Sequence, residues 1–323
     1  MKLKKEIEFG GRKLILETGH LAKQASGSCV VTYGETMLLV AATSSKGHEE
    51  DRGFFPLSVE YREKYYASGK IPGGFFKREA RPTEKEILSS RLTDRPLRPL
   101  FAEGFNNETR LDINVISYDE VNEPDVFAAL GASFALSLSD IPFNGPIASV
   151  RVGRVNNELI MNPTKEQMLE SDYDLVLSGS KESIVMVEGK CEFVSEDDVL
   201  MAIQYGHEGI KELIQLQEDL LSEMNVVKRD VPLKEINEDL NKSIDKLVEG
   251  KISSLNDPKD KHSRYSDVDN FISSIVDSLM EEYPDSQSEI KKYIDGLVAL
   301  DLREKTLNGK RADGRDLITV RDI

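Results

Sequence analysis

The pattern of apolar residues changes near Val231, and this change constrains the fold more than any other feature of the chain. Before it, short runs that alternate or are rich in β-branched residues predict strands. After it, Leu and Ile recur at three- and four-residue spacing among Asp, Glu, Lys and Ser, which predicts helices with a loop around residues 256–266. With 323 residues, 39% of them hydrophobic, the chain is long enough for about two soluble domains. We expect a mixed part with strands and helices, followed by a small helical part.

Turn residues divide the first part into hairpins. Gly34-Glu35 is a glycine-first pair typical of a type II′ turn, and Asn156-Asn157 is a second turn signal. Residues 111–115 alternate apolar and polar side chains, as a half-buried strand does. Residues 124–139 predict a helix whose many small residues indicate close packing against a sheet, with a structural role for the Ser133 and Ser137 hydroxyls. Further strands are predicted at 28–33, 36–41, 147–155, 158–161, 175–177 and 184–187, and a long helix from Ser195 to about Met224.

Residues 73–101, GGFFKREARPTEKEILSSRLTDRPLRPLF, concentrate positive charge in a chain whose net charge is −16. Seven Lys/Arg and four Asp/Glu lie between residues 77 and 98. Two glycines free the backbone, so that two adjacent phenylalanine rings can project from a loop. Stacking on such rings is worth roughly 1–3 kcal/mol per base whatever the sequence, and adjacent cations can contact phosphates. The loop residues predicted to bind single-stranded RNA are Phe75, Phe76, Lys77 and Arg78.

A helix is predicted directly after this loop. Thr83 and Glu86 have the spacing of a capping box, so the helix should begin near Glu84. It should carry three apolar side chains toward the core and end after Arg95, because Pro96 follows. These apolar residues are Ile87, Leu88 and Leu92. Three arginines on or just beyond the helix, suited to bidentate phosphate contact, are Arg91, Arg95 and Arg98; their alternative role is to pair with Asp94, Glu84 or distant acids.

This segment closely resembles the signature of the first RNase PH-like core domain of bacterial polynucleotide phosphorylases. The similarity continues through residues 17–45, 54–74, 122–127 and 141–155 and in effect covers the whole chain. Ala80 stands where the family often has glycine, and Lys77 where some members have arginine, but neither departure changes the charge pattern. The resemblance implies an α+β fold: an RNase PH-like core, with a ribosomal protein S5 domain 2-like sheet and packed helices, followed by a small all-α domain.

The resemblance also implies a division of the chain into domains. Residues 1–142 and 143–228 would form the first and second parts of the core, and residues 229–308 an all-helical linker domain. Residues 309–323 contain Arg311-Ala312-Asp313-Gly314-Arg315, which resembles the start of the family's second RNase PH-like core. We therefore expect the chain to be an N-terminal portion of a longer protein.

The family's chemistry is 3′-to-5′ phosphorolysis of RNA. Inorganic phosphate attacks the terminal phosphodiester and nucleoside diphosphates leave, with Mg²⁺ and cationic groups stabilising the charge on the phosphoryl group. The resemblance implies that the second core supplies the catalytic groups and binds the metal. It further implies a homotrimeric ring whose phenylalanine loops line a constriction for single-stranded RNA, possible RNA-degradosome partners, no membrane contact and a cytoplasmic location.

The first core is expected to be catalytically degenerate. The family's active copy has an aspartate and, two residues on, a lysine; here Asp174 is followed by Val176. Residues 130–134 replace the hydroxyls of the active copy's phosphate-binding helix start with apolar groups. We expect no catalytic residue and no metal site here, and interpret Asp172 and Asp174 as solvated turn carboxylates. Two alternatives remain open: a stand-alone, non-enzymatic RNA-binding scaffold, and an independent enzyme that uses these two aspartates.

Composition excludes several other classes. A net charge of −16 argues against a protein that coats nucleic acid or lies on a membrane surface, and residues 126–138, the longest weakly polar run, are too short to span a bilayer. The N-terminal residues lack the apolar stretch of a signal peptide. The two cysteines, without CxxC spacing, are expected to be reduced and buried: Cys29 and Cys191. The four histidines, none at ligand spacing, are expected to be structural or exposed: His20, His48, His207 and His262.

Overall fold

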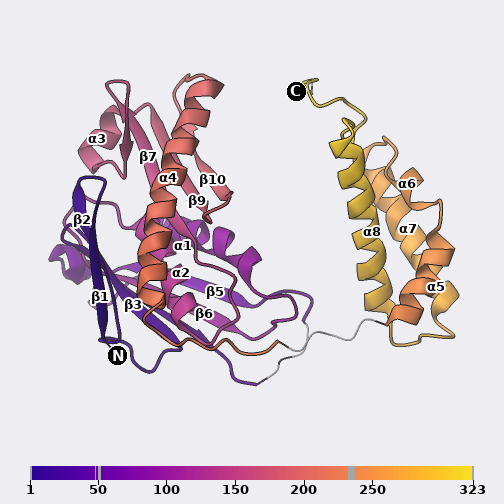
Figure 1. Ribbon diagram of the computed structural model, residues 1–323, viewed down its shortest axis with the longest axis horizontal. Coiled ribbons are helices and arrows are strands. Elements are labelled where there is room, and N and C mark those ends of the chain that lie inside the picture. Colours follow the sequence, from indigo (N-terminus) through magenta and orange to yellow (C-terminus); the bar gives the residue numbers. More distant parts are fainter. Residues whose placement is uncertain (1, 48, 50–51, 232–236, 322–323) are drawn as a thin grey trace. The chain divides into compact units, whose positions relative to one another are not determined.

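The computed structural model describes residues 2–47, 49, 52–231 and 237–321. The chain divides into two compact units, Met1–Leu233 and Lys234–Ile323, and Figure 1 shows strands and helices in the first and helices in the second. His48 lies outside the described residues. None of the helices within these ranges combines the length and the apolar character needed to cross a membrane.

The first unit contains a six-stranded sheet of order β1-β2-β3-β4-β6-β5. All neighbouring strands are antiparallel except β5 and β6. The predicted hairpin is confirmed, since Tyr33 pairs with Thr36 across a two-residue turn with Gly34 at φ +59°. The strands are β1 (Leu3–Phe9), β2 (Arg12–Thr18), β3 (Gly27–Tyr33), β4 (Thr36–Ser44), β5 (Leu57–Glu63) and β6 (Thr109–Ser117). The predicted alternation in β6 is confirmed by the complete burial of Leu111, Ile113 and Val115.

A second sheet has four antiparallel strands in the order β10-β9-β7-β8. Asn156 and Asn157 both have positive φ in the turn between β7 and β8, as a type I′ hairpin requires. This confirms the second predicted turn. The strands are β7 (Ala148–Val155), β8 (Glu158–Met161), β9 (Tyr173–Gly179) and β10 (Ile184–Cys191).

Helix α2 connects the two sheets, because it packs on β3 and β4 of the first and on β7 of the second. Thirteen of its fourteen residues are buried. The predicted close packing is confirmed at Gly131, where an added Cβ would lie 2.6 Å from a methyl carbon of Val40. Ser133 has the predicted structural role: its Oγ accepts from the Ile147 N–H at 2.8 Å and donates to Gln217 Oε1 at 3.0 Å.

Helices α1 and α4 pack around this centre, and α4 runs beside β7 and β1 (Figure 1). Ser195 caps α4 as predicted, its Oγ accepting from the Asp198 N–H. The helices of this unit are α1 (Glu84–Leu97), α2 (Asp125–Leu138), α3 (Lys165–Glu170) and α4 (Glu196–Leu221), with 3₁₀ turns η1 (Tyr65–Ser68) and η2 (Arg98–Leu100).

Helix α1 begins as predicted, with both hydrogen bonds of the Thr83–Glu86 capping box present. The predicted buried face is wrong, because Ile87 and Leu88 are 50% and 49% exposed. The side chain of Glu86 takes the buried position instead, since its two carboxylate oxygens accept from the Thr83 and Glu63 N–H groups at 2.7 and 2.8 Å. The buried face consists of Glu86, Ser89, Thr93, Pro96 and Leu97, with Leu92 partly buried against the core.

The predicted end of α1 at Arg95 is also wrong. Pro96 lies inside the helix, which continues to Leu97 and then tightens into η2. A proline inside a helix removes the hydrogen bond that its own N–H would donate and crowds the carbonyl four residues before it. Because Pro96 is the last residue but one of α1, these effects fall on the final turn alone, and the helix still reaches Leu97.

The second unit is a bundle of helices around an apolar core. Helix α7 begins at Lys261, so the predicted loop over 256–266 is wrong for residues 261–266, which are helical. It begins there because Asp260 caps it, its Oδ1 accepting from the Ser263 N–H at 3.0 Å. The helices are α5 (Glu238–Val248), α6 (Ile252–Leu255), α7 (Lys261–Leu279) and α8 (Gln287–Leu307). Their buried core comprises Leu240, Ile244, Val248, Ile272, Ile275, Val276, Leu279, Ile290 and Ile294.

Gly131→Ala should destabilise the first unit by about 1–3 kcal/mol, because the new methyl group would overpack the contact with Val40 and Val31. The matched control is Gly296→Ala on α8, where an added Cβ meets nothing within 4 Å. That variant should gain roughly 0.5–1 kcal/mol from helix propensity. Urea unfolding measures both, and equal effects of the two substitutions would contradict the packing argument.

Candidate nucleic-acid interface

The loop between η1 and α1 presents two aromatic rings to solvent. Phe75 and Phe76 are 92% and 77% exposed, and their ring centroids lie 5.4 Å apart in an edge-to-face arrangement. Lys77 and Arg78 follow, and neither forms an ion pair with any residue that the structure describes. A hollow of about 320 Å³ is lined by these rings and by Arg78, Glu79 and Ala80. The predicted loop residues thus form one surface with exposed rings and unpaired cations.

The C-terminal end of this loop is attached to the sheet. Arg62 Nη2, on β5, donates to the Ala80 carbonyl at 2.6 Å. The Tyr65 N–H, on η1, donates to Glu79 Oε1 at 3.3 Å. The backbone just after the exposed rings is therefore fixed. This reduces the conformational entropy that the loop would lose when it binds a ligand.

The three arginines predicted to form a row have different surroundings. Arg98 donates to Asp94 and to the carbonyls of Phe55 and Leu57, so its guanidinium is used within the chain. Arg95 pairs with Glu188 on β10. Arg91 is exposed and has no ion pair in the described part of the chain. Of the three arginines, Arg91 alone has no ion-pair partner in the described part of the chain, and in this it resembles Lys77 and Arg78.

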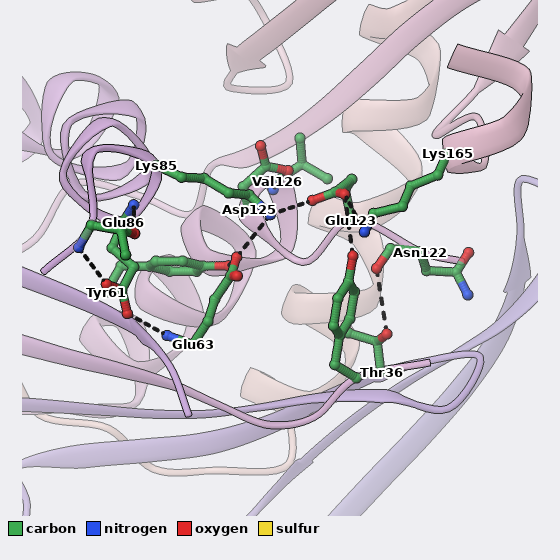
Figure 2. Close-up of polar contacts among 12 residues, drawn as sticks. Thr36, Tyr61, Glu63, Lys85, Glu86, Asn122, Glu123, Asp125, Val126 and Lys165 are labelled. Carbon is green, nitrogen blue, oxygen red and sulfur yellow. Dashed lines mark hydrogen bonds and ion pairs between the residues drawn. The ribbon is translucent and has the colours of Figure 1, made fainter. Parts of the chain in front are cut away.

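A network of charges joins the start of α1 to the segment before α2, as Figure 2 shows. Lys85 Nζ lies 2.8 Å from Glu123 Oε2 and 3.0 Å from Glu63 Oε1. Glu123 Oε1 accepts from the Tyr118 hydroxyl at 3.2 Å and lies 3.3 Å from Lys165 Nζ. Burial acts to raise the pKa of Glu123, but the hydrogen bonds and charges of Lys85 and Lys165 hold that pKa below its ordinary value of 4.5.

Sequence reasoning missed this network. Its members lie on β5, α1, α3 and the segment before α2, so no spacing along the chain relates them. The one sequence signal that could have pointed to it was the segment 122–127. This segment contributed to the family resemblance, but the sequence analysis assigned no role to Glu123.

Arg151 occupies the centre of a second charged site. It is 13% exposed, and its two terminal nitrogens lie 2.5 Å from Asp125 Oδ2 and 2.8 Å from Asp174 Oδ1. Val176 lies opposite Arg151 on the paired strand and is buried. A hollow of about 490 Å³ is lined by these three charged residues together with Lys85, Glu123 and Lys165.

The prediction that Asp172 and Asp174 are solvated turn carboxylates is wrong for Asp174, which lies on a strand, whereas Asp172 lies at a bend with its side chain 37% exposed. Asp174 lies on β9 and Asp172 directly before it, and the antiparallel pairing with β7 brings an arginine to each. Arg154 Nη2 lies 2.5 Å from Asp172, and Arg151 pairs with Asp174. The guanidiniums of Arg154 and Arg151 therefore supply the positive charge that a bound metal ion would otherwise bring to these two carboxylates. In the ranges that the structure describes, no group of three or more His, Cys, Asp or Glu could hold a metal ion.

The remaining thiols and imidazoles form no catalytic arrangement within the described residues. Cys29 is buried as predicted, its Sγ lies 3.2 Å from the Gly131 carbonyl, and burial raises the pKa of the thiol. Cys191 is exposed, so its predicted burial is wrong; it ends the outer strand of its sheet. His207 bonds the Ser180 carbonyl through Nε2, while His20 and His262 are exposed.

Three family descriptions match the chain. Residues 10–142 match "3' exoribonuclease family, domain 1" and residues 145–209 match "3' exoribonuclease family, domain 2". Residues 239–316 match "Polyribonucleotide nucleotidyltransferase, RNA binding domain". The first two matches fall within the first compact unit and the third within the second.

Curated relatives match the chain from end to end. A polyribonucleotide nucleotidyltransferase from Geotalea uraniireducens is 45% identical over 324 residues, which cover 100% of this chain and 47% of the relative. One from Gemmatimonas aurantiaca is 48% identical over 319 residues, covering 98% of this chain and 43% of the relative. The chain thus spans about half the length of the curated relatives it matches.

A solved structure supports the fold. The crystal structure of rice (Oryza sativa) Rrp46 has a TM-score of 0.50 and 15% sequence identity, and the match covers 68% of this chain and 93% of that chain. At this identity the likeness concerns the fold alone. Together with the family matches it confirms the predicted α+β class with an RNase PH-like core.

Arg151→Ala should destabilise the first unit by about 3–5 kcal/mol, because it leaves the buried Asp125 carboxylate without its partner. Urea unfolding measures the loss. Lys211→Ala, which removes an exposed pair with Glu208, is the control and should cost about 0–1 kcal/mol. A loss below 1 kcal/mol for both variants would show that the Arg151 pairs do not organise this site.

Glu123→Gln should reduce stability at pH 7 and have less effect in acid. The pKa of Glu123 is lowered in the folded protein, so its carboxylate stabilises the fold above pH 4.5 and loses that contribution as the pH falls through the folded pKa. The stability gap between the parent chain and the variant should therefore shrink below pH 4.5. Urea unfolding at pH 3 to 7 measures the gap, with exposed Glu158→Gln as control. A gap independent of pH would contradict the charge network.

Proposed function

The chain belongs to the polyribonucleotide nucleotidyltransferase family, and on that premise we propose that it is the RNA-binding and assembly half of a 3′-to-5′ phosphorolytic exoribonuclease. The observation that carries the proposal is the exposed loop of Phe75, Phe76, Lys77 and Arg78. Its rings can stack on bases and its cations can contact phosphates without breaking an internal pair. The full-length protein would degrade mRNA and release nucleoside diphosphates.

The loop favours single-stranded RNA over a duplex. Bases in a duplex are already stacked and paired, so two solvent-exposed rings gain little from them. A single strand offers its bases freely, and this mode of binding needs no particular sequence. We propose that Arg91 extends the cationic surface and that Arg98 and Arg95 support it through their contacts with Asp94 and Glu188.

The chemical step is assigned to the half of the full-length protein that lies outside this chain. Mg²⁺ would stabilise charge on the transferring phosphoryl group. Asp125 and Asp174 do not fit a metal-binding role, because they already share the guanidinium of Arg151. Val176 adds an apolar side chain where phosphoryl transfer needs a cation.

Assembly and location belong to the same proposal. We propose a homotrimer in which three such loops surround one entrance, a cytoplasmic location, and association with other RNA-degrading proteins. A ring would place six phenylalanine side chains around a single strand, which makes the selectivity for unpaired RNA a property of the assembly.

One rival function has a specific observation in its favour. Buried Val176 is compatible with a stand-alone RNA-binding scaffold that never joins an active half. The similarity to relatives about twice as long favours the first proposal. The independent enzyme based on Asp172 and Asp174 is not proposed, because both carboxylates are paired with arginines.

The purified 323-residue chain should bind poly(A) but release no ADP in the presence of Mg²⁺ and inorganic phosphate. Phe76→Ala should weaken binding by about 5- to 150-fold, the loss of one stacked base. Arg78→Ala should lower the magnitude of the slope of log K against log salt by about 0.7, the contribution of one phosphate contact on a single strand. Filter binding and an ADP assay measure these outcomes.

The control is Phe193→Ala, which removes an exposed aromatic ring of the first unit away from the loop. It should leave binding unchanged. Phosphate-dependent ADP release by this chain would overturn the degenerate assignment, and poly(A) binding insensitive to Phe76→Ala and Arg78→Ala would remove the loop as the RNA site.

A further inference from the structure

A hollow of about 290 Å³ lies beside the loop, between the end of β5, η1 and the start of α1. We call it the β5–η1 hollow. Its volume is at the lower end for a small-molecule site, which suits one base and its sugar. The lining residues that matter here are Arg62, Lys64, Tyr65, Glu79 and Arg81.

The hollow is continuous with the loop surface. Glu79 and Ala80 line both the β5–η1 hollow and the hollow beneath the phenylalanine rings. The same two residues are held by Tyr65 and Arg62 through the hydrogen bonds that attach the loop. A strand that leaves the rings therefore meets the β5–η1 hollow without crossing another element.

The cations that line the hollow differ in whether they form an ion pair. Lys70 lies 3.9 Å from Glu120, and Lys165 lies 3.3 Å from Glu123, so both cations have partners. Lys64 and Arg81 form no ion pair with a residue in the described part of the chain. They leave two uncommitted positive charges in the lining for an anionic ligand, while the carboxylates of Glu63, Glu86 and Glu120 in the same lining pair with other cations.

Polar and aromatic groups complete the site. Arg62 Nη1 is buried without a hydrogen-bond partner among the described residues, and lies 3.7 Å from Glu86. Tyr65 is an aromatic residue that lines the hollow and is 37% exposed. Its turn is fixed, because the Lys70 N–H donates to the Tyr65 carbonyl at 2.9 Å and the Tyr118 N–H to the Ala67 carbonyl at 3.0 Å. An exposed aromatic residue on a fixed turn, beside unpaired cations, is a combination that can bind a nucleotide.

We propose that the β5–η1 hollow binds one further nucleotide of the RNA strand that the phenylalanine loop holds. The base stacks on the Tyr65 ring, and the phosphate lies between Lys64 and Arg81. The inference rests on the proposed RNA-binding function and adds a third stacking position to the two rings of the loop.

Fluorescence anisotropy with a labelled 12-nucleotide oligo(A) tests the site in the 323-residue chain. Tyr65→Ala should weaken binding at least about fivefold, the lower end for one stacked base. Tyr65→Phe should bind like the parent, because stacking uses the ring and not the hydroxyl. Arg81→Ala should lower the magnitude of the salt slope by about 0.7. A 5-iodouridine oligonucleotide should cross-link to the peptide that contains Tyr65.

The failure of this inference differs from failure of the proposed function. If Phe76→Ala weakens binding while Tyr65→Ala does not and no cross-link reaches Tyr65, the hollow is not a nucleotide site and the loop remains one. If none of the three substitutions Phe76→Ala, Tyr65→Ala and Arg81→Ala changes binding, both proposals fall. The Tyr65→Phe variant keeps the ring in place and so separates lost stacking from lost folding.

Discussion

The burial of helix α2 between two sheets is the constraint on which the first unit depends. Thirteen of its residues are buried, and β3 and β4 approach Gly131 so closely that a methyl group there has no room. A helix buried on every side must be apolar or satisfied internally, and Ser133 meets this condition by bonding Ile147 and Gln217. Because α2 touches both sheets, it also sets the position of one relative to the other.

Both charged sites lie at the N-terminal end of this helix. Asp125 stands at its first turn and faces Arg151 on β7, while Glu123, two residues earlier, faces Lys85 on α1. Each of these charges is buried or half-buried and has a partner, since an unpaired charge there would be costly. The partners are also what makes the site unsuitable for a metal ion. The same contacts that stabilise the core therefore account for its proposed lack of phosphorolytic chemistry.

The loop cations have the opposite arrangement. Lys77, Arg78 and Arg81 lie in a chain with 58 acidic and 42 basic residues, yet they pair with none of the described acids. Uncommitted cations on a surface attract a polyanion without first breaking an internal pair. The contrast between paired core arginines and unpaired loop cations separates structural charge from charge available for RNA.

Local features were predictable from the sequence. The capping box at Thr83, the Gly34-Glu35 and Asn156-Asn157 turns and the alternation in β6 all depend on residues close together in the chain. Their hydrogen bonds and periodicities involve only residues that are near one another in the sequence. The exposed phenylalanine rings and the nearby cations of the loop could be predicted for the same reason.

Only the tertiary structure decided which face of α1 is buried and which carboxylates are paired. Apolar residues were predicted to face the core, but Glu86 faces it because its carboxylate satisfies the Glu63 N–H on β5. Asp174 was predicted to be solvated, but the register of β9 against β7 places Arg151 beside it. The sequence by itself determined the elements and the exposed loop. Distant pairs depend on strand register and helix docking, and no spacing along one chain encodes these.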